Sequence, residues 1–73
     1  MKQKQIIQKY LESLNTWVEE YKVRCINTPH GFIGARGDRN VREMIQDGEI
    51  EASMQGKYRI VRAKLVKPMR FEL

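Results

Sequence analysis

The sequence lacks the features that cross-link a chain or insert it into a membrane. Its 73 residues include a single cysteine, Cys25, so no disulfide can form within the chain. A chain this short builds only a small core, and without disulfides it is more typical of a reducing cytoplasm than of secretion. No apolar run approaches the roughly 18–20 residues needed to span a bilayer, and residues 1–7 lack the apolar stretch of a signal peptide. We therefore expect a single-domain cytoplasmic protein with no membrane partner.

Residues that build metal or catalytic sites are also scarce. Cys25 and His30, the one histidine, are two candidate ligands, whereas a structural zinc site needs four. The same pair lacks a third group that would orient a nucleophile and its base. Residues 31–37 contain three glycines but not the Lys-Ser/Thr of a phosphate-binding loop. The sequence therefore predicts no enzyme activity, no metal, no cofactor and no small-molecule substrate.

Acidic residues are missing from one long stretch. Residues 1–51 carry eight basic and eight acidic residues, which cancel, whereas residues 52–71 contain no acidic residue. That stretch accounts for most of the net charge of +5 and holds six basic residues, namely Lys57, Arg59, Arg62, Lys64, Lys67 and Arg70. A local excess of this kind indicates a polyanionic partner, although a solvated, solubilising surface explains it equally well.

The apolar residues of the N-terminal region follow a helical period. They lie on one face of an amphipathic helix expected over residues 2–14, namely Ile6, Ile7, Tyr10, Leu11 and Leu14.

Residues 15–24 leave three interpretations open. The first helix continues through Tyr21, or a second helix begins at Thr16 with Glu19 completing a capping box, or a short strand at 17–18 precedes a helix over about 19–24. All three interpretations place Trp17 in the core, and Tyr10 and Tyr21 are likewise expected in the core rather than in a platform for stacking bases.

Residues 26–37 have the composition of a loop, with three glycines and one proline. We expect Phe32 and Ile33 to turn inward and attach this loop to the core. Asp38 is a suitable N-cap, Val41, Met44 and Ile45 share one face of a helix that extends to about Asp47, and Gly48 is suited to end it.

After Gly48 the period changes to that of strands. Residues 49–53 and 58–63 alternate around a turn at 54–57 and predict a β-hairpin. With Gln55-Gly56 as a two-residue turn, Ile50 lies opposite Val61, and Glu49 lies opposite Arg62 as a favourable cross-strand pair.

This order of elements predicts an α+β fold, a winged helix-turn-helix of three helices followed by a two-stranded β-hairpin wing. The domain is expected to cover residues 1–66 and to be followed by a C-terminal tail, residues 67–73.

Four stretches carry a family resemblance. They read TPHGFIG at 28–34, GDRNVREM at 37–44, DGEIE at 47–51 and GKYRIVR at 56–62. Through them the chain resembles, from Trp17 to Arg62, a family of small winged-helix proteins common in phages and prophages. The resemblance implies the fold more specifically than the function, because winged helices also serve as protein-interaction domains.

The third predicted helix, residues 38–47, carries the candidate base contacts on the side opposite its apolar face. Arginine forks onto guanine, glutamine pairs with adenine and glutamate accepts from cytosine, which gives the set Arg39, Arg42, Glu43 and Gln46. Arg36 precedes the helix, where a phosphate can meet the N-terminus, although Asp38 opposes an anion there. The alternative is an ordinary solvated face in which Arg39 and Glu43 neutralise each other as an i, i+4 pair.

The predicted wing carries the candidate backbone contacts. Lys57 and Arg59 near its tip and Arg62 on its second strand can meet phosphates or the minor groove. The leading hypothesis is thus a double-stranded-DNA-binding protein, a small phage or bacterial transcription regulator that can form a homodimer to read two half-sites. The alternative is a protein-interaction module with the same fold, which an apolar surface patch formed by Tyr10, Trp17 or Tyr21 would favour.

Overall fold

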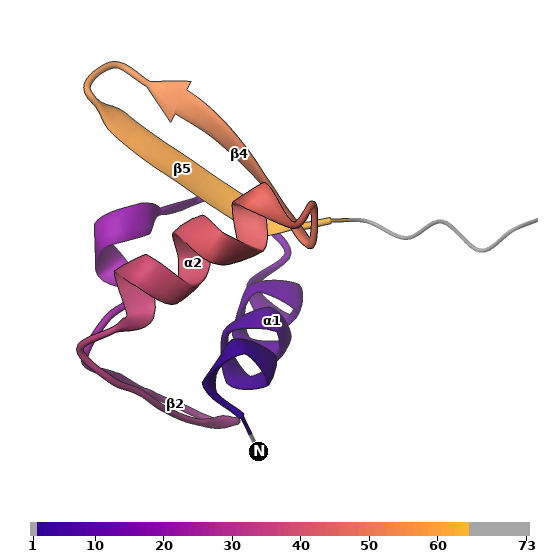
Figure 1. The fold of residues 1–73 in the computed structure, drawn as a ribbon, viewed down its shortest axis with the longest axis vertical. Coiled ribbons are helices and arrows are strands. Elements are labelled where there is room, and N and C mark those ends of the chain that lie inside the picture. The colour runs from indigo at the N-terminus through magenta and orange to yellow at the C-terminus, as the bar shows by residue number, and fades with distance from the viewer. Residues whose placement is uncertain (1, 65–73) are drawn as a thin grey trace, which may run out of the picture.

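A computed structural model describes residues 2–64 of the chain as an α+β fold (Figure 1). In chain order the elements are α1 (Gln3–Leu14), β1 (Val18–Glu19), the 3-10 helix η1 (Glu20–Lys22), β2 (Ile26–Thr28), β3 (Gly31–Ile33), α2 (Gly37–Gln46), β4 (Ile50–Gln55) and β5 (Tyr58–Ala63). The predicted domain boundary at 66/67 and the tail lie outside the described residues. Within the described part, no helix is long and apolar enough to cross a membrane.

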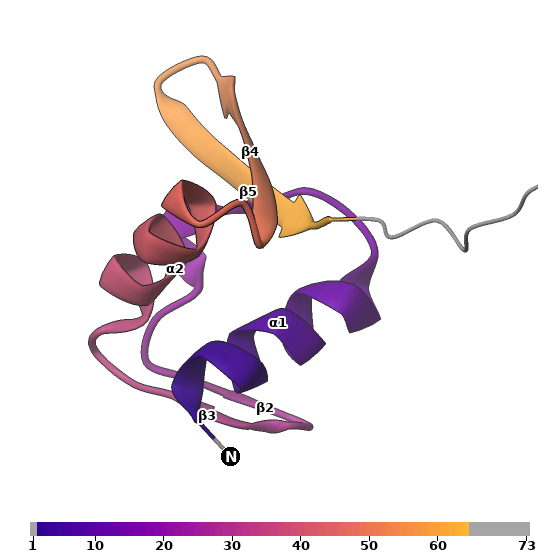
Figure 2. The same ribbon diagram turned by 45° about the vertical axis from the view of Figure 1, so that its right-hand side comes forward.

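The strands form two separate antiparallel sheets. One has three strands in the order β1-β5-β4, and the other is the β2–β3 hairpin. Figures 1 and 2 show the β4–β5 hairpin extending away from the helices at its turn, while its base lies beside α2. The β2–β3 hairpin crosses below α1 at the opposite end of the fold.

A single apolar core joins both helices to both sheets. Its fully buried side chains come from every part of the described chain and are Ile7, Leu11, Val23, Ile33, Met44, Val41 and Val61. Tyr10 and Ile45 are partly buried against this cluster, as expected. The core ends at the base of the β4–β5 hairpin, where Ile50 and Ala63 are its last buried members.

The prediction of three helices was wrong. Within residues 2–64 there are two α-helices, and the segment between α1 and β2 forms β1 and the short η1 instead. Asn15 ends α1 in the left-handed conformation (φ 50°), and its backbone N–H donates to the Leu11 carbonyl. Of the three open interpretations, the one with a short strand came closest to the structure.

The expected burial of Trp17 was also wrong. A helix would have turned Trp17 toward the core, whereas the strand β1 turns it away from the core. Val18 faces the core side of the sheet opposite Val61, and alternation along a strand turns its neighbour Trp17 to the outer side. Trp17 is 36% exposed and Tyr21, which was also expected in the core, is 54% exposed.

The segment expected to be a loop contains the β2–β3 hairpin, in which Ile26 pairs with Ile33 and Thr28 with Gly31. Ile33 is fully buried, as expected, but Phe32 on the other face is 54% exposed. The Thr28 hydroxyl donates to the Gly31 carbonyl at 2.7 Å and accepts the His30 N–H at 3.1 Å, which closes the turn.

The ends of α2 confirm one prediction and correct another. Arg36, not Asp38, is the N-cap residue, and Asp38 lies in the first turn of the helix. Gly48 ends the helix as expected, with φ 75°. Its N–H donates to the Ile45 carbonyl and the next N–H donates to the Met44 carbonyl, the pattern of a Schellman motif.

The β4–β5 hairpin is present, but the predicted two-stranded wing was wrong, because β1 pairs with β5 as a third strand. The register of the hairpin also differs from the predicted one. The turn residues are Gly56 and Lys57, so Ile50 pairs with Ala63 and Glu51 with Arg62. Gly56 takes φ 63°, which suits glycine as the first residue of a two-residue hairpin turn. The shift is two residues along the partner strand, so Ile50 and Val61 still share the buried face.

Candidate nucleic-acid interface

The outer side of α2 presents three of the predicted base-contacting side chains. Val41 and Met44 are fully buried and fix the rotation of the helix. Arg39, Arg42 and Gln46 lie on its opposite side and are exposed. Arg42 has no carboxylate within ion-pair distance in the described part of the chain, so its guanidinium is free to bind another group.

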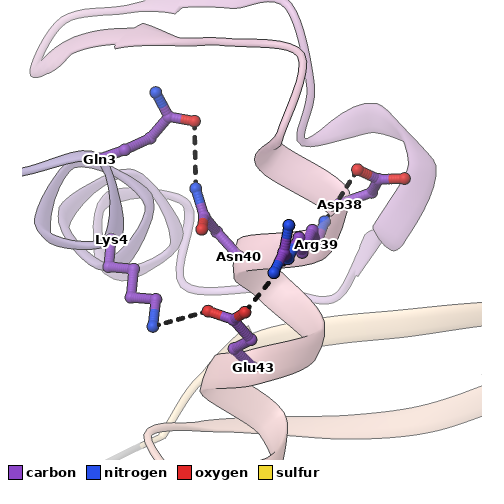
Figure 3. Close-up of polar contacts among 6 residues, drawn as sticks. All are labelled: Gln3, Lys4, Asp38, Arg39, Asn40 and Glu43. Carbon is purple, nitrogen blue, oxygen red and sulfur yellow. Dashed lines mark hydrogen bonds and ion pairs between the residues drawn. The ribbon is translucent and has the colours of Figure 1, made fainter.

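Glu43 differs from these neighbours because it is bound to α1. Its carboxylate accepts from Lys4 Nζ at 2.9 Å and lies 3.4 Å from Arg39 Nε (Figure 3). The hydrogen bond from Lys4 holds the pKa of Glu43 below its ordinary value and raises the pKa of Lys4. Beside this pair, the Asn40 amide donates to Gln3 Oε1 at 3.2 Å. This flank of α2 faces α1, and its carboxylate already has partners.

The N-terminus of α2 carries both charges. Arg36 is exposed at the N-cap. Asp38 accepts the backbone N–H of Arg39 at 2.8 Å, and one of its oxygens lies 3.6 Å from Arg24. A carboxylate in the first turn satisfies the helix dipole, so an incoming phosphate has to compete with Asp38 at this end.

A close backbone contact sets the position of this helix start. A Cβ added to Gly37 would lie 2.0 Å from the Val23 carbonyl oxygen and 2.7 Å from a methyl group of Ile33. The residue at 37 therefore has to be glycine for α2 to begin against β3 and the segment after η1. The sequence pattern singled out Gly37 only as the residue before a cap, since its φ is not in the left-handed region.

The β4–β5 hairpin adds basic side chains on the α2 side of the sheet. Arg59 alternates with Val61 and so lies on the core side, beyond the last buried residues. Its guanidinium is 3.8 Å from Glu20, whose carboxylate has one buried oxygen without a hydrogen bond. Lys57 is exposed at the turn. Arg59 thus adds a basic side chain on the α2 side of the hairpin, and Lys57 adds another at its tip.

Arg62 lies on the outer side of the same sheet and is not part of that surface. Its Nε donates to Glu51 at 2.6 Å, which corrects the predicted pairing with Glu49. Its guanidinium carbon lies 4.5 Å from the centre of the Trp17 ring, a cation–π contact. The two partners hold Arg62 against the sheet.

The structure thus brings most of the predicted residues to one side and separates two of them. We call this side the α2–hairpin surface, and it consists of Arg36, Arg39, Arg42, Gln46, Lys57 and Arg59. Glu43 is turned toward α1 and Arg62 toward the outer face of the sheet. Arg24 was missed, because it lies in the segment with three interpretations. It lines a hollow beside this surface together with Arg42, Asp38, Glu20 and Tyr21.

A second exposed surface was not predicted. Trp17 and Tyr58, which is 52% exposed, lie on the outer side of the β1-β5-β4 sheet, and Tyr21 of η1 lies at its edge. The rings of Tyr21 and Tyr58 pack against each other, with their centres 5.6 Å apart. Assigning Trp17 and Tyr21 to the core by helical spacing concealed this surface in the sequence.

No group of three or more His, Cys, Asp and Glu side chains that could hold a metal ion occurs within residues 2–64. Comparison with known proteins finds no matching family model, no matching curated protein and no matching solved structure. The winged-helix resemblance therefore stays a prediction, and the geometry described above is the basis for any statement about function.

Proposed function

We propose that the chain binds duplex DNA through the α2–hairpin surface, as a winged-helix variant in which η1 stands where a second helix would be expected. The observation that carries this proposal is that α2 has exposed arginines on its outer side, while the β4–β5 hairpin beside it projects away from the helices (Figure 1) and carries Lys57 and Arg59. In this interpretation the protein is a small regulator of phage or bacterial type, which is the leading hypothesis from the sequence.

The helix supplies the base contacts in this proposal. A major groove about 12 Å wide admits one α-helix, and α2 has only polar and charged side chains on its outer side. Arg42 and Gln46 lie one turn apart on that side, so their side chains reach neighbouring base pairs. Arginine favours guanine and glutamine favours adenine. Glu43 is not among the proposed base-contacting side chains, because its carboxylate is bound by Lys4.

The hairpin supplies the backbone contacts. Lys57 at the turn and Arg59 on β5 lie beyond the core, where they can follow a phosphate strand next to the groove that holds α2. The pair between Arg59 and Glu20 is long, at 3.8 Å, and the Arg59 side chain is 41% exposed, so its guanidinium can meet a phosphate from the solvent side.

The test is a fluorescence-anisotropy titration of a random 20-base-pair duplex over a salt series. If about three phosphates are contacted, log Kd changes with log salt with a slope of magnitude about 3, and Lys57→Gln lowers this magnitude by about 1. Lys9→Gln is the matched control, because Lys9 is an exposed lysine on α1, away from the α2–hairpin surface. Absence of binding at low salt, or equal losses for both variants, would reject the proposed surface.

A second candidate function, a protein-interaction module, is favoured by the exposure of Trp17 and Tyr21. Buried aromatic side chains would have argued against it. Trp17 lies on the outer side of the three-stranded sheet, away from α2, whereas Tyr21 also lines the hollow that contains Arg42, so the two surfaces meet at Tyr21.

A further inference from the structure

The outer side of the β1-β5-β4 sheet carries the largest group of exposed aromatic side chains in the described part of the chain. Tyr58, Ile60 and Arg62 alternate along β5 and point to this side, and Glu19 of β1 pairs with Ile60. Trp17 precedes β1 and lies beside Arg62. We call this surface the aromatic face, defined by Trp17, Tyr21, Tyr58 and Ile60.

The rings of this face are held in place, which is what a binding surface requires. Arg62 covers one side of the Trp17 ring, and Glu51 fixes Arg62 in turn. Tyr21 packs on Tyr58 with the ring planes tilted by 51°, and its hydroxyl donates to Glu19 at 3.2 Å. A hollow beside the rings is lined by Trp17, Val18 and Ile60 together with three polar residues, Glu19, Lys22 and Gln55.

The charges of this face are paired with one another. Glu19 accepts from Lys22 Nζ at 2.9 Å, and Glu51 accepts from Arg62 at 2.6 Å. These contacts leave an aromatic surface close to neutral, in contrast to the basic α2–hairpin surface. A neutral, apolar partner fits it better than a strand of phosphates, which would meet the two carboxylates.

The area indicates a small partner. Aromatic side chains bury about 150–250 Å² each, so the exposed fractions of Trp17, Tyr21 and Tyr58 leave roughly 200–350 Å² of aromatic surface. A stable interface between two folded proteins needs about 800 Å² on each side. The aromatic face alone is therefore too small for a stable dimer but sufficient for a short extended peptide.

We propose that the aromatic face binds a proline-rich segment of another protein in the polyproline II conformation. Such segments dock into grooves lined by aromatic rings and lose little entropy on binding, because their conformation is already formed. Proline rings pack in the hollow between Trp17 and Ile60 and on the Tyr21–Tyr58 pair. The free peptide carbonyls accept hydrogen bonds from polar groups on the rim, of which the Gln55 amide is one. The protein would then join DNA on one side of its sheet to a partner protein on the other.

The test is a titration of the 15N-labelled protein with an acetylated decaproline peptide, followed by NMR. We expect the Trp17 indole signal and the backbone signals of β5 to shift with a Kd in the range of micromolar to about 1 mM. Tyr58→Ala should weaken binding tenfold or more. Phe32→Ala is the matched control, because Phe32 is an equally exposed aromatic residue on β3, at the other end of the fold, and its loss should leave binding unchanged.

Three results would overturn the proposal. One is that decaproline at several millimolar leaves the Trp17 signal in place in a folded protein. Another is that an octathymidine strand, and not the peptide, shifts these signals, which assigns the face to single-stranded nucleic acid. The third is sedimentation as a dimer that Tyr58→Ala dissociates, which assigns the face to a second copy of the chain. The duplex titration is independent of all three, since it concerns the other side of the sheet.

Discussion

The two β-hairpins of this chain are similar in topology but differ in what holds them. The β2–β3 hairpin lies against α1 along its length, with Ile33 fully buried and Gly31 in close contact with the Ile6 side chain. The β4–β5 hairpin is buried only at its base, and its outer half exposes Met54 and Tyr58. Both hairpins contribute to the core, β2–β3 through Ile33 and β4–β5 through the residues at its base, but only β4–β5 extends beyond the core into solvent.

This difference separates the residues that maintain the fold from those available to a partner. Ile33 and Gly31 of β2–β3 are enclosed by other parts of the chain, so a change at these two positions acts on stability. Side chains in the outer half of β4–β5 have solvent around them, so a change there acts on binding. Substitutions matched between the two regions test this division.

The largest effect is expected at Gly37, where α2 begins beside β3. In Gly37→Ala the added methyl group would overlap the Val23 carbonyl oxygen, at 2.0 Å, and the helix start would have to move. Overpacking of this kind costs about 3 kcal/mol or more, a large share of the stability of a small domain. We expect Gly37→Ala to be mostly unfolded at 25 °C by circular dichroism.

Gly56→Ala, in the turn of the β4–β5 hairpin, is the control for Gly37→Ala. Gly56 has φ 63° and no atom within 4 Å of an added Cβ, so only backbone strain opposes the substitution, at about 1 kcal/mol. If Gly37→Ala unfolds in urea at the same concentration as the wild type, the close packing of Gly37 against Val23 and Ile33 is wrong. If Gly56→Ala lowers the free energy of unfolding more than Gly37→Ala does, the β4–β5 turn matters more for stability than the start of α2, and the proposed division is wrong.

The sequence predicted those parts of the fold that depend on local signals. The limits of α2, its end at Gly48 and the presence of the β4–β5 hairpin follow from apolar period and glycine placement within a few residues. The outward Arg39, Arg42 and Gln46 followed from the same period.

The parts that sequence reasoning missed depend on distant partners. β1 is two residues long and exists because it pairs with β5 near the end of the described chain. Without that pairing, helical spacing was the stronger signal for Trp17 and Tyr21, and it placed them in the core. Gly37 was underrated for the same reason, since its Cβ is excluded by Val23 and Ile33 and not by its own backbone conformation.

Two side-chain truncations, one in each hairpin, test the same difference in stability between β2–β3 and the outer half of β4–β5. Ile33→Ala on β3 removes a fully buried side chain and should lower the free energy of unfolding by about 3 kcal/mol. Met54→Ala on β4 removes a side chain that is 60% exposed and should change this free energy by no more than about 0.5 kcal/mol. Urea unfolding, followed by circular dichroism at 25 °C, gives both values. Equal losses for the two variants would mean that the outer half of β4–β5 is packed in solution.

The smallest effect concerns the polar contact between the two helices, Lys4 with Glu43. The hydrogen bond from Lys4 lowers the pKa of Glu43. The stability that this pair adds to the fold is therefore fully present above the ordinary glutamate pKa of about 4.3, and it is lost as the pH falls through the lowered pKa. At the other end of the scale Glu43 raises the pKa of Lys4. The contribution is therefore fully present below the ordinary lysine pKa of about 10.4 and is lost as the pH rises through the raised value.

We therefore expect Glu43→Gln to lower the urea midpoint slightly at pH 7, and the difference from wild type to vanish in acid. Glu12→Gln, at an exposed position of α1, controls for the loss of one carboxylate. A difference between Glu43→Gln and wild type that stays constant down to pH 2 would show that Glu43 does not act through its charged pair with Lys4. In that case the Glu43 carboxylate is available to contact DNA bases, as a third base-contacting side chain on α2 beside Arg42 and Gln46.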